Sequence, residues 1–414
     1  MSMKTPTTDL VIIGGGAAGL MAACRAAEKG LHATVLEPNA KPGRKLRITG
    51  KGRCNLTNNC PPQEFLRNVL SGDKFVRSAI YRFSPQDAMD YFESLGVPLK
   101  TERGERVFPV SDRADDVADA LECRARSLGV RFRRERALEI LTENGAVSAV
   151  RTTESVLETP RALICTGGLS YPATGSTGDG YALAEALGHR ITPCSASLVP
   201  LEAGPDCDKL QGLSLRNVTL SLWRGDRLLY RELGEMLFTH FGVSGPLVLS
   251  ASAEVRGAGP YRMTVDLKPG LTAEKLDERL LRDFAENKNR CFKNSLDALL
   301  PQKLISVVIG RSGIDGETRV NSVTRAQRLA LGELLKAFPL EVYGKRGVEE
   351  AIVTSGGVDT AEVNPRTMES RLVPGLFFAG EVLDMDAYTG GFNLQLAWST
   401  AVCAVNAMEK ENME

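Results

Sequence analysis

The chain has 414 residues, a length that suits two or three domains. Of these residues 43% are hydrophobic and 25% are charged, which is typical of a globular protein. Lys and Arg together number 51, as do Asp and Glu, so the formal net charge is zero. This balance excludes a general electrostatic attraction to nucleic acid or to an anionic membrane. We therefore expect a small-molecule substrate and no nucleic-acid partner, and the sequence leaves the oligomeric state open.

The cysteines and the apolar runs indicate the compartment. The nine cysteines are odd in number and scattered, and the start of the chain lacks the pattern of a secretory signal. No charge-free apolar run reaches the ~18 residues that a membrane-spanning helix needs. We expect a cytoplasmic protein with reduced thiols and no membrane span.

The residue pattern changes along the chain in a way that predicts a discontinuous α/β domain. Predicted strands and helices alternate over residues 1–194, and the pattern returns over 349–414. Between these parts, residues 195–270 predict antiparallel strands and residues 271–348 predict helices. The Gly-, Lys- and Arg-rich stretch 40–60 has little periodicity, and we expect a loop there.

A dinucleotide-binding turn lies near the start of the chain. Gly14, Gly16 and Gly19 form a G-x-G-x-x-G pattern between a predicted strand and a predicted helix. The three glycines permit a tight turn, a close approach of the backbone to a pyrophosphate, and close helix–strand packing. Glu37 ends the next strand, where a carboxylate accepts hydrogen bonds from ribose hydroxyls and disfavours the 2′-phosphate of NADP.

A distant segment indicates that the dinucleotide is FAD. An apolar strand over 373–379 ends in Gly380 and Glu381, and this carboxylate suits the ribityl hydroxyls of a flavin. Gly391 then opens the last helix, whose positive N-terminal end would stabilise an anionic reduced flavin. A capped C-terminal helix without a ligand is the alternative.

The sequence also resembles a known family, the BaiN/YhiN-type bacterial flavoproteins. The most specific matching segments are Gly43–Asn58 and Gly380–Asn393, and the resemblance covers nearly the whole chain. Further segments that match are Arg106–Pro109, Thr166–Gly180 and Thr239–Pro246.

The resemblance implies a fold and an activity. It implies a Rossmann-like FAD domain built from both ends of the chain, with an inserted β-barrel part and a helical part. It also implies oxidoreductase activity, with steroid-like enone reduction in one part of the family and amine oxidation in another.

These patterns together predict the site residues. Candidate catalytic residues are Cys54, Asn55, Asp384 and Tyr388. We expect the cofactor-binding residues to be Gly14, Gly16, Ala17, Ala18, Gly19, Glu37, Pro38, Arg44, Lys45, Gly52, Arg53, Cys54, Asn55, Ala137, Thr166, Gly167, Gly168, Gly380, Glu381, Asp384, Gly391, Phe392, Asn393, Leu394 and Gln395.

Several of these roles stay open at the level of sequence. Five residues separate Cys54 from Cys60, where flavin disulfide reductases have four, which argues against a redox disulfide. Cys54 is then an ordinary small residue near the flavin or a thiol tuned by Arg53. Asp384 and Tyr388 bind substrate, donate a proton or shape a loop.

Arg44 and Lys45 contact the FAD phosphates or belong to a solvated basic loop. The three histidines have no spacing that suggests a metal site, and we expect none.

The leading functional interpretation is an FAD-dependent oxidoreductase that exchanges a hydride with a small or medium apolar organic molecule. NADH or NADPH, as electron donor of an activated C=C reductase, would act transiently, because a second G-x-G-x-x-G is absent. One alternative is an oxygen-using amine or aminoketone oxidase. Another is a flavin-containing RNA- or protein-binding module, for which the basic runs at 131–134 and near 288–293 are too short to decide.

Overall fold

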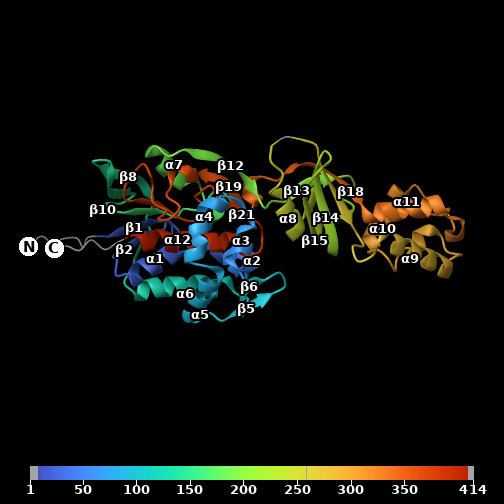
Figure 1. The fold of residues 1–414 in the computed structure, drawn as a ribbon, viewed down its shortest axis with the longest axis horizontal. Helices are drawn as coiled ribbons and strands as arrows, with labels where there is room; N and C mark the ends of the chain where they lie inside the picture. Colours follow the sequence, from blue (N-terminus) through green and yellow to red (C-terminus); the bar gives the residue numbers. More distant parts are fainter. Residues whose placement is uncertain (1–7, 258, 409–414) are drawn as a thin grey trace, which may run out of the picture. The chain divides into compact units, whose positions relative to one another are not determined.

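The computed structural model describes residues 8–257 and 259–408 (Figure 1). The chain divides into two compact units: unit 1 comprises Met1–Ser197 and Val348–Glu414, and unit 2 comprises Leu198–Gly347. Both ends of the described chain therefore belong to unit 1, and unit 2 is an insertion into it.

A five-stranded parallel sheet forms the centre of unit 1. Nearly all of its strand residues are buried, as is usual for a parallel sheet covered on both faces. Ile12 lies opposite Leu163 on one neighbouring strand and Val35 on the other. In order across the sheet, the strands are β20 (Leu376–Phe378), β11 (Ala162–Ile164), β1 (Leu10–Ile13), β2 (Ala33–Leu36) and β7 (Arg131–Arg133).

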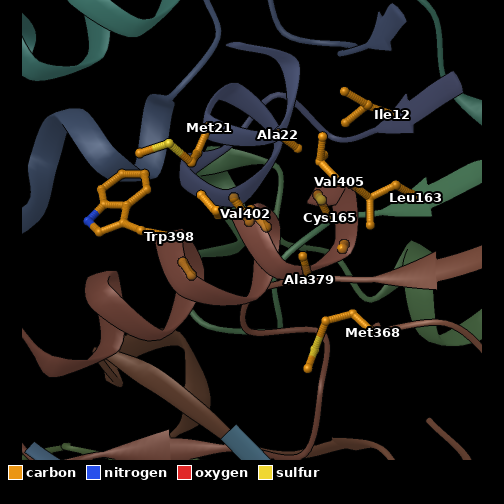
Figure 2. Close-up of a cluster of buried hydrophobic side chains, with 14 of the residues drawn as sticks. Ile12, Met21, Ala22, Leu163, Cys165, Met368, Ala379, Trp398, Val402 and Val405 are labelled. Atoms are coloured by element: carbon orange, nitrogen blue, oxygen red, sulfur yellow. The ribbon is translucent and has the colours of Figure 1, made fainter. Parts of the chain in front are cut away.

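Two helices from opposite ends of the chain pack against each other in unit 1. They are α1 (Ala17–Glu28) and α12 (Phe392–Ala407), and both are rich in alanine, which permits a close approach. Figure 2 shows Met21 of α1 beside Trp398 and Val402 of α12, and Met21 and Trp398 are fully buried. Burial of such large apolar side chains stabilises each by about 1.5–3 kcal/mol, so this contact holds the two ends of the chain together.

Smaller elements surround this core. The remaining α-helices of unit 1 are α2 (Arg44–Gly52), α3 (Pro62–Leu66), α4 (Asp73–Arg82), α5 (Pro85–Ser94), α6 (Ala114–Ser127) and α7 (Asp179–Ala186). Its short 3-10 turns are Pro172–Thr174, Val348–Glu350 and Thr360–Glu362. Its smaller sheets are β3 (Thr57–Asn58) with β6 (Arg106–Pro109) and β5 (Leu99–Glu102); β10 (Val156–Glu158) with β9 (Ala146–Thr152) and β8 (Ala137–Glu143); β21 (Asp386–Ala387) with β4 (Val69–Ser71); and β12 (Ile191–Ser197) with β19 (Val353–Val358).

Unit 2 contains a closed antiparallel barrel of six strands. The helices α9, α10 and α11 lie together at one end of it (Figure 1). Around the barrel the strands are β13 (Leu201–Gly204), β16 (Gly242–Ser244), β15 (Arg227–Thr239), β14 (Ser214–Arg224), β17 (Tyr261–Asp266) and β18 (Phe338–Lys345). Its helices are α8 (Pro246–Ser252), α9 (Ala273–Glu286), α10 (Gln302–Ser312) and α11 (Arg325–Lys336), and its 3-10 turns are Phe292–Asn294 and Val320–Ser322.

This architecture confirms the predicted fold class, an α/β Rossmann-like domain with an inserted barrel and helices. Within the part predicted to be helical, however, residues 338–345 form the strand β18. This strand closes the barrel by pairing with β13 and β17. The error arose because strand pairing with residues far away in the sequence decides the conformation of so short a segment.

The predicted loop over 40–60 is wrong over residues 44–48, where α2 (Arg44–Gly52) is regular; at Thr49, Gly50 and Lys51 the backbone leaves the helical conformation. Only Leu46 of this helix is buried, so the sequence carries no apolar periodicity. The helix is held by tertiary ion pairs instead: Arg47 contacts Asp115 at 2.6 Å and Asp119 at 2.7 Å, both on α6. Among the described residues, no helix is long and apolar enough to cross a membrane.

Candidate functional site

The glycine-rich turn between β1 and α1 is as compact as its sequence predicts. A methyl group at Gly19 would lie 1.9 Å from the carbonyl oxygen of Gly14, and one at Gly14 would lie 2.6 Å from that of Cys165. Gly14 also has a φ of +103°, which disfavours any other residue. By contrast, no atom lies within 4 Å of the position that a methyl group at Gly16 would occupy. The turn is therefore closed on the protein side and open at Gly16.

The first turn of α1 offers unsatisfied donors at this open point. Gly16 is the N-cap residue, and no side chain caps the helix. Backbone N–H groups of the first helical turn have no partner within the helix, and they carry partial positive charge. Ala17 and Ala18 thus present main-chain donors suited to a phosphate.

Glu37 lies over the glycine turn at the end of β2. Its Oε2 accepts a hydrogen bond from the Gly15 N–H at 2.9 Å, and its Oε1 accepts two from Asn39, from the backbone and side-chain nitrogens, each at 2.8 Å. Arg44 Nη1 in turn donates to Asn39 Oδ1 at 2.9 Å. Arg44 is therefore linked to Glu37 through Asn39, while Pro38 is exposed.

Lys45 and Glu381 are 336 residues apart in sequence, and they form an ion pair. Lys45 Nζ lies 2.5 Å from Glu381 Oε2 and donates to Ser170 Oγ at 2.6 Å. Ser170 Oγ also donates to Glu381 Oε1 at 2.9 Å, and the Thr354 backbone N–H donates to the same oxygen at 2.8 Å. The Glu381 carboxylate is thereby fixed by three different segments.

The segment after β11 lies between these two groups. A methyl group at Gly14 would lie 3.0 Å from the Thr166 Cα, and one at Gly168 would lie 3.0 Å from Glu381 Oε1. Gly167 has a φ of +75°. The Thr166–Gly168 turn therefore joins the glycine turn to the Glu381 cluster, as expected where the carboxyl ends of parallel strands meet.

The predicted cysteine–asparagine segment packs directly on the start of α12. A methyl group at Gly391 would lie 2.2 Å from the carbonyl oxygen of Thr57. Thr57 Oγ1 donates to Gln395 Oε1 at 2.6 Å, and Asn58 Nδ2 donates to the Gly390 carbonyl at 3.0 Å. These contacts bring together the two segments that the resemblance marks as most specific.

The first turn of α12 also lacks a side-chain cap. Gly391 is its N-cap, with a φ of +99°, so the helix begins with free backbone donors, as α1 does. The Asn393 side chain instead fixes the preceding loop: it accepts from the Ala387 N–H at 3.0 Å and donates to the carbonyls of Ala387 and Tyr388 at 2.8 and 3.3 Å. Tyr388 also donates its backbone N–H to Asn68, so its position is fixed from two sides.

Cys54 and Asn55 differ in what they can do chemically. Cys54 is fully buried, and burial raises the pKa of its thiol to about 12, so it is a neutral thiol near pH 7. Asn55 Oδ1 is buried and has no hydrogen-bond partner among the described residues. A buried amide oxygen without a partner costs about 1–3 kcal/mol, which indicates that a ligand atom donates to it.

Arg53 faces away from Cys54 toward acidic partners. Its guanidinium contacts Glu102 and Asp112, each at 2.5 Å, and lies over the Phe108 ring at 4.1 Å. The hydrogen bond to Glu102 and then that to Asp112 raise the pKa of Arg53 further. These carboxylates neutralise the charge that would lower the pKa of the Cys54 thiol.

The remaining predicted residues lie at the edges of this arrangement. Gln395 is fully buried, its side chain donates to the Phe83 carbonyl and Ser399, and its backbone N–H donates to the Gly391 carbonyl, so it holds the start of α12 in place. Phe392 is buried against Phe65. Ala137 begins β8 in a separate sheet, while Gly52, Gly380, Asp384 and Leu394 are placed beside or within the segments described above.

The observed geometry fits FAD. Two uncapped helix N-termini, those of α1 and α12, supply donors for phosphates and for an electron-rich ring. Carboxylates at the ends of β2 and β20 supply acceptors for hydroxyl groups. The unpartnered Asn55 oxygen supplies a further acceptor. Among the described residues, no group of three His, Cys, Asp or Glu side chains could hold a metal ion.

Comparison with known proteins now identifies the family. The model of the HI0933-like protein Rossmann domain matches residues 8–407. The chain belongs to the HI0933-like family. Proteins of this family are FAD-dependent oxidoreductases, which confirms the enzyme class and the family predicted from the sequence.

Two curated relatives match almost the whole chain. The ribosomal RNA dihydrouridine synthase of Escherichia coli is 33% identical over 96% of this chain and 97% of its own length. The 3-dehydro-bile acid delta(4,6)-reductase of Clostridium scindens is 31% identical over 96% of this chain and 98% of its own. Among solved structures, the 3-ketosteroid-delta4-(5alpha)-dehydrogenase of Rhodococcus jostii is similar with a TM-score of 0.54, 15% identity and 98% coverage of both chains, which shows a shared fold.

Sequence reasoning missed several residues of the site. Ser170 and Thr354 hold Glu381, and Asn39 holds Glu37; Thr354 and Asn39 are common polar residues outside any recognised pattern, whereas Ser170 lies within the matching segment Thr166–Gly180. Only Ser170 carried a signal, because it follows the Thr166–Gly168 turn by two residues. Asn58 lay inside the matched segment and was a detectable candidate.

Proposed function

We propose that this HI0933-like enzyme is a reductase of a carbon–carbon double bond conjugated with a carbonyl group, with NADH or NADPH as the electron donor. The similarity to the two relatives carries this proposal. The name of one describes formation of dihydrouridine, in which the uracil ring loses a double bond next to a carbonyl, and the name of the other describes reduction of 3-oxo bile acids. The products of these two reactions differ, but in both the bond that is reduced is a carbon–carbon double bond conjugated with a carbonyl group.

We assign the cofactor's phosphates to the first turn of α1, its ribose to Glu37 and its ribityl chain to Glu381. The uncapped start of α12 and the Asn55 oxygen suit the polar edge of the ring system. FAD held by these residues would supply the two-electron chemistry that links the nicotinamide to the substrate carbon. The chain itself must position the substrate and provide a proton.

Tyr388 is our candidate for the proton donor. A phenol ordinarily carries its proton near neutral pH and can therefore donate it to a substrate carbon. The hydrogen bond that Asn393 donates to the Tyr388 carbonyl and the one that the Tyr388 N–H donates to Asn68 hold the Tyr388 backbone in place beside α12. Across the reaction the double bond gains a hydride, which originates from NAD(P)H, and a proton from the Tyr388 hydroxyl, which is then restored from solvent.

The decisive experiment is product analysis. The FAD-loaded enzyme is incubated without oxygen with NADPH or NADH and, separately, a 4-en-3-one steroid, 3-oxo bile acids with conjugated double bonds, and uridine-containing RNA. We expect one of these to gain two hydrogens, and the Tyr388→Phe variant to lose about 10²–10⁴-fold in turnover while its flavin is still reduced by the nicotinamide.

Two other outcomes separate this proposal from the alternatives. In a parallel incubation in air with an amine substrate, stoichiometric hydrogen peroxide, with the nicotinamide unable to reduce the flavin, would establish the oxidase alternative. RNA binding without reduction of any of these substrates would establish a binding module. The sequence predicts no nucleic-acid partner, whereas the names of two relatives include ribosomal RNA, so RNA is included among the substrates to be tested.

A further inference from the structure

The helical part of unit 2 carries an excess of positive charge that the neutral whole chain conceals. Residues 272–336 contain twelve Lys and Arg against nine Asp and Glu. The excess is concentrated in two short segments, 287–294 and 318–328, which contain six Lys and Arg and no acidic residue.

The fold brings these two segments side by side. Cys291 and Arg319 form an antiparallel bridge, the Phe292 N–H donates to the Thr318 carbonyl at 2.8 Å, and the Val320 N–H donates to the Arg290 carbonyl at 3.1 Å. Each run alone is too short to bind a polyanion. Joined, they make one continuous surface whose existence the sequence could not show.

Four cations of this surface are exposed and form no salt bridge with a described acidic residue, and one of them, Arg325, is close enough to Asp277 to help lower the pKa of that carboxyl. Of the six, Lys293 pairs with Glu317, and Arg328 pairs with Asp277 at 2.6 Å. The remaining four form no ion pair among the described residues, and we call them the basic surface: Lys288, Arg290, Arg319 and Arg325.

The composition around the basic surface favours a phosphate backbone over other anions. Short polar side chains stand beside the cations. Asn289, Asn294 and Asn321 can donate hydrogen bonds to a ligand, whereas Asn287, Ser322 and Thr324 donate within the fold. A membrane-surface segment would add exposed apolar side chains; within the two segments Phe292 and Val320 are buried, and the exposed large apolar side chains of the helical part, Leu281 and Leu329, lie outside them. Lys and Arg interspersed with Asn, Ser and Thr are the residues that contact phosphate and sugar in nucleic-acid complexes.

From these observations we infer that the basic surface on the helical part of unit 2 binds the phosphate backbone of RNA. This inference rests on the proposed function, because it identifies RNA as the substrate class of the reductase. The surface supplies affinity without base recognition, since arginines and lysines on phosphates carry no sequence information.

The test is RNA binding measured separately from catalysis. Fluorescence anisotropy of a short labelled single-stranded RNA of mixed sequence is recorded with the FAD-loaded enzyme over a range of salt concentrations. Four phosphate contacts predict a log–log salt slope of about −3, which weakens binding roughly 50-fold between about 50 and 200 mM salt. The variant K288Q/R290Q/R319Q/R325Q should lose this dependence and most of the binding.

The matched control removes four other exposed cations of unit 2 that form no ion pair among the described residues. The control variant is R216Q/R227Q/R231Q/K275Q, and it should bind RNA with the slope of the parent. Equal FAD content and equal unfolding temperature of the two variants exclude a folding defect.

Two outcomes would overturn the inference: no RNA binding by the parent at low salt, or equal losses of RNA binding in the two variants. Neither of these bears on reduction of small substrates by the same preparation. Conversely, failure of NAD(P)H to reduce the flavin would remove the proposed function while leaving the binding result intact.

Discussion

The contact between Gly391 and Thr57 gives the sharpest prediction, because it joins the two ends of the site. Replacing Gly391 by Ala places a methyl group 2.2 Å from the Thr57 carbonyl oxygen, at a residue with a φ of +99°. A left-handed conformation costs a non-glycine residue about 1–2 kcal/mol. Forced displacement of packed atoms adds about 1–3 kcal/mol. Gly391→Ala should therefore destabilise unit 1 by about 2–5 kcal/mol.

Gly129→Ala is the matched control. Gly129 has a φ of +88° and belongs to the same unit, but a methyl group there meets nothing within 4 Å. Gly129→Ala should lower the free energy of unfolding only by the cost of the left-handed conformation, about 1–2 kcal/mol. Trp398 lies in α12 and reports unfolding of unit 1 in urea by its fluorescence, in a background where Trp223 of unit 2 is replaced by Phe. Equal losses of stability in the two variants would refute the argument that this close approach is structural, as would normal FAD retention by Gly391→Ala.

Three further predictions concern charged and titrating side chains. Lys45→Met leaves the half-buried Glu381 carboxylate without its cation, so the Kd for FAD should rise about tenfold, measured by flavin fluorescence; an unchanged Kd would show that the ion pair does not order the site. Cys54→Ser should leave flavin reduction nearly unchanged, and iodoacetamide should label native Cys54 very slowly at pH 8, because burial raises the pKa of the thiol to about 12; rapid labelling would contradict that burial. Burial lowers the pKa of His189 below its usual 6.5 despite the neighbouring Glu362, so the unfolded state binds its proton first. Stability should therefore be full above about pH 6.5 and fall as the pH drops below it, and His189→Gln should flatten that part of the urea-unfolding profile.

The sequence was sufficient for the parts of the site that depend on local backbone chemistry. Gly14, Gly16 and Gly19 sit where a strand turns into a helix, and their spacing predicts the turn in combination with the predicted strand before it and the predicted helix after it. Glu37 follows from its distance along the chain to that turn. The apolar strand before Gly380 predicted a buried strand, and β20 lies there. In each case a few consecutive residues determine the geometry.

Contacts between distant segments were not predictable in this way. The pairing of Lys45 with Glu381 depends on two turns that meet only after the sheet has formed. The ion pairs of Arg53 with Glu102 and Asp112 similarly depend on residues some fifty to sixty positions away in the sequence. The strand β18 and the basic surface share this origin: short segments whose partners are far away in the sequence carry no periodicity of their own.

The most direct measurement of the central claim is rapid anaerobic mixing of the purified, FAD-loaded protein with NADH and with NADPH, followed by flavin absorbance. The account predicts that one nicotinamide bleaches the flavin quickly, and that addition of a conjugated carbonyl substrate restores the oxidised spectrum without oxygen. A flavin that neither nicotinamide reduces, or a protein that cannot be loaded with FAD at all, would contradict it.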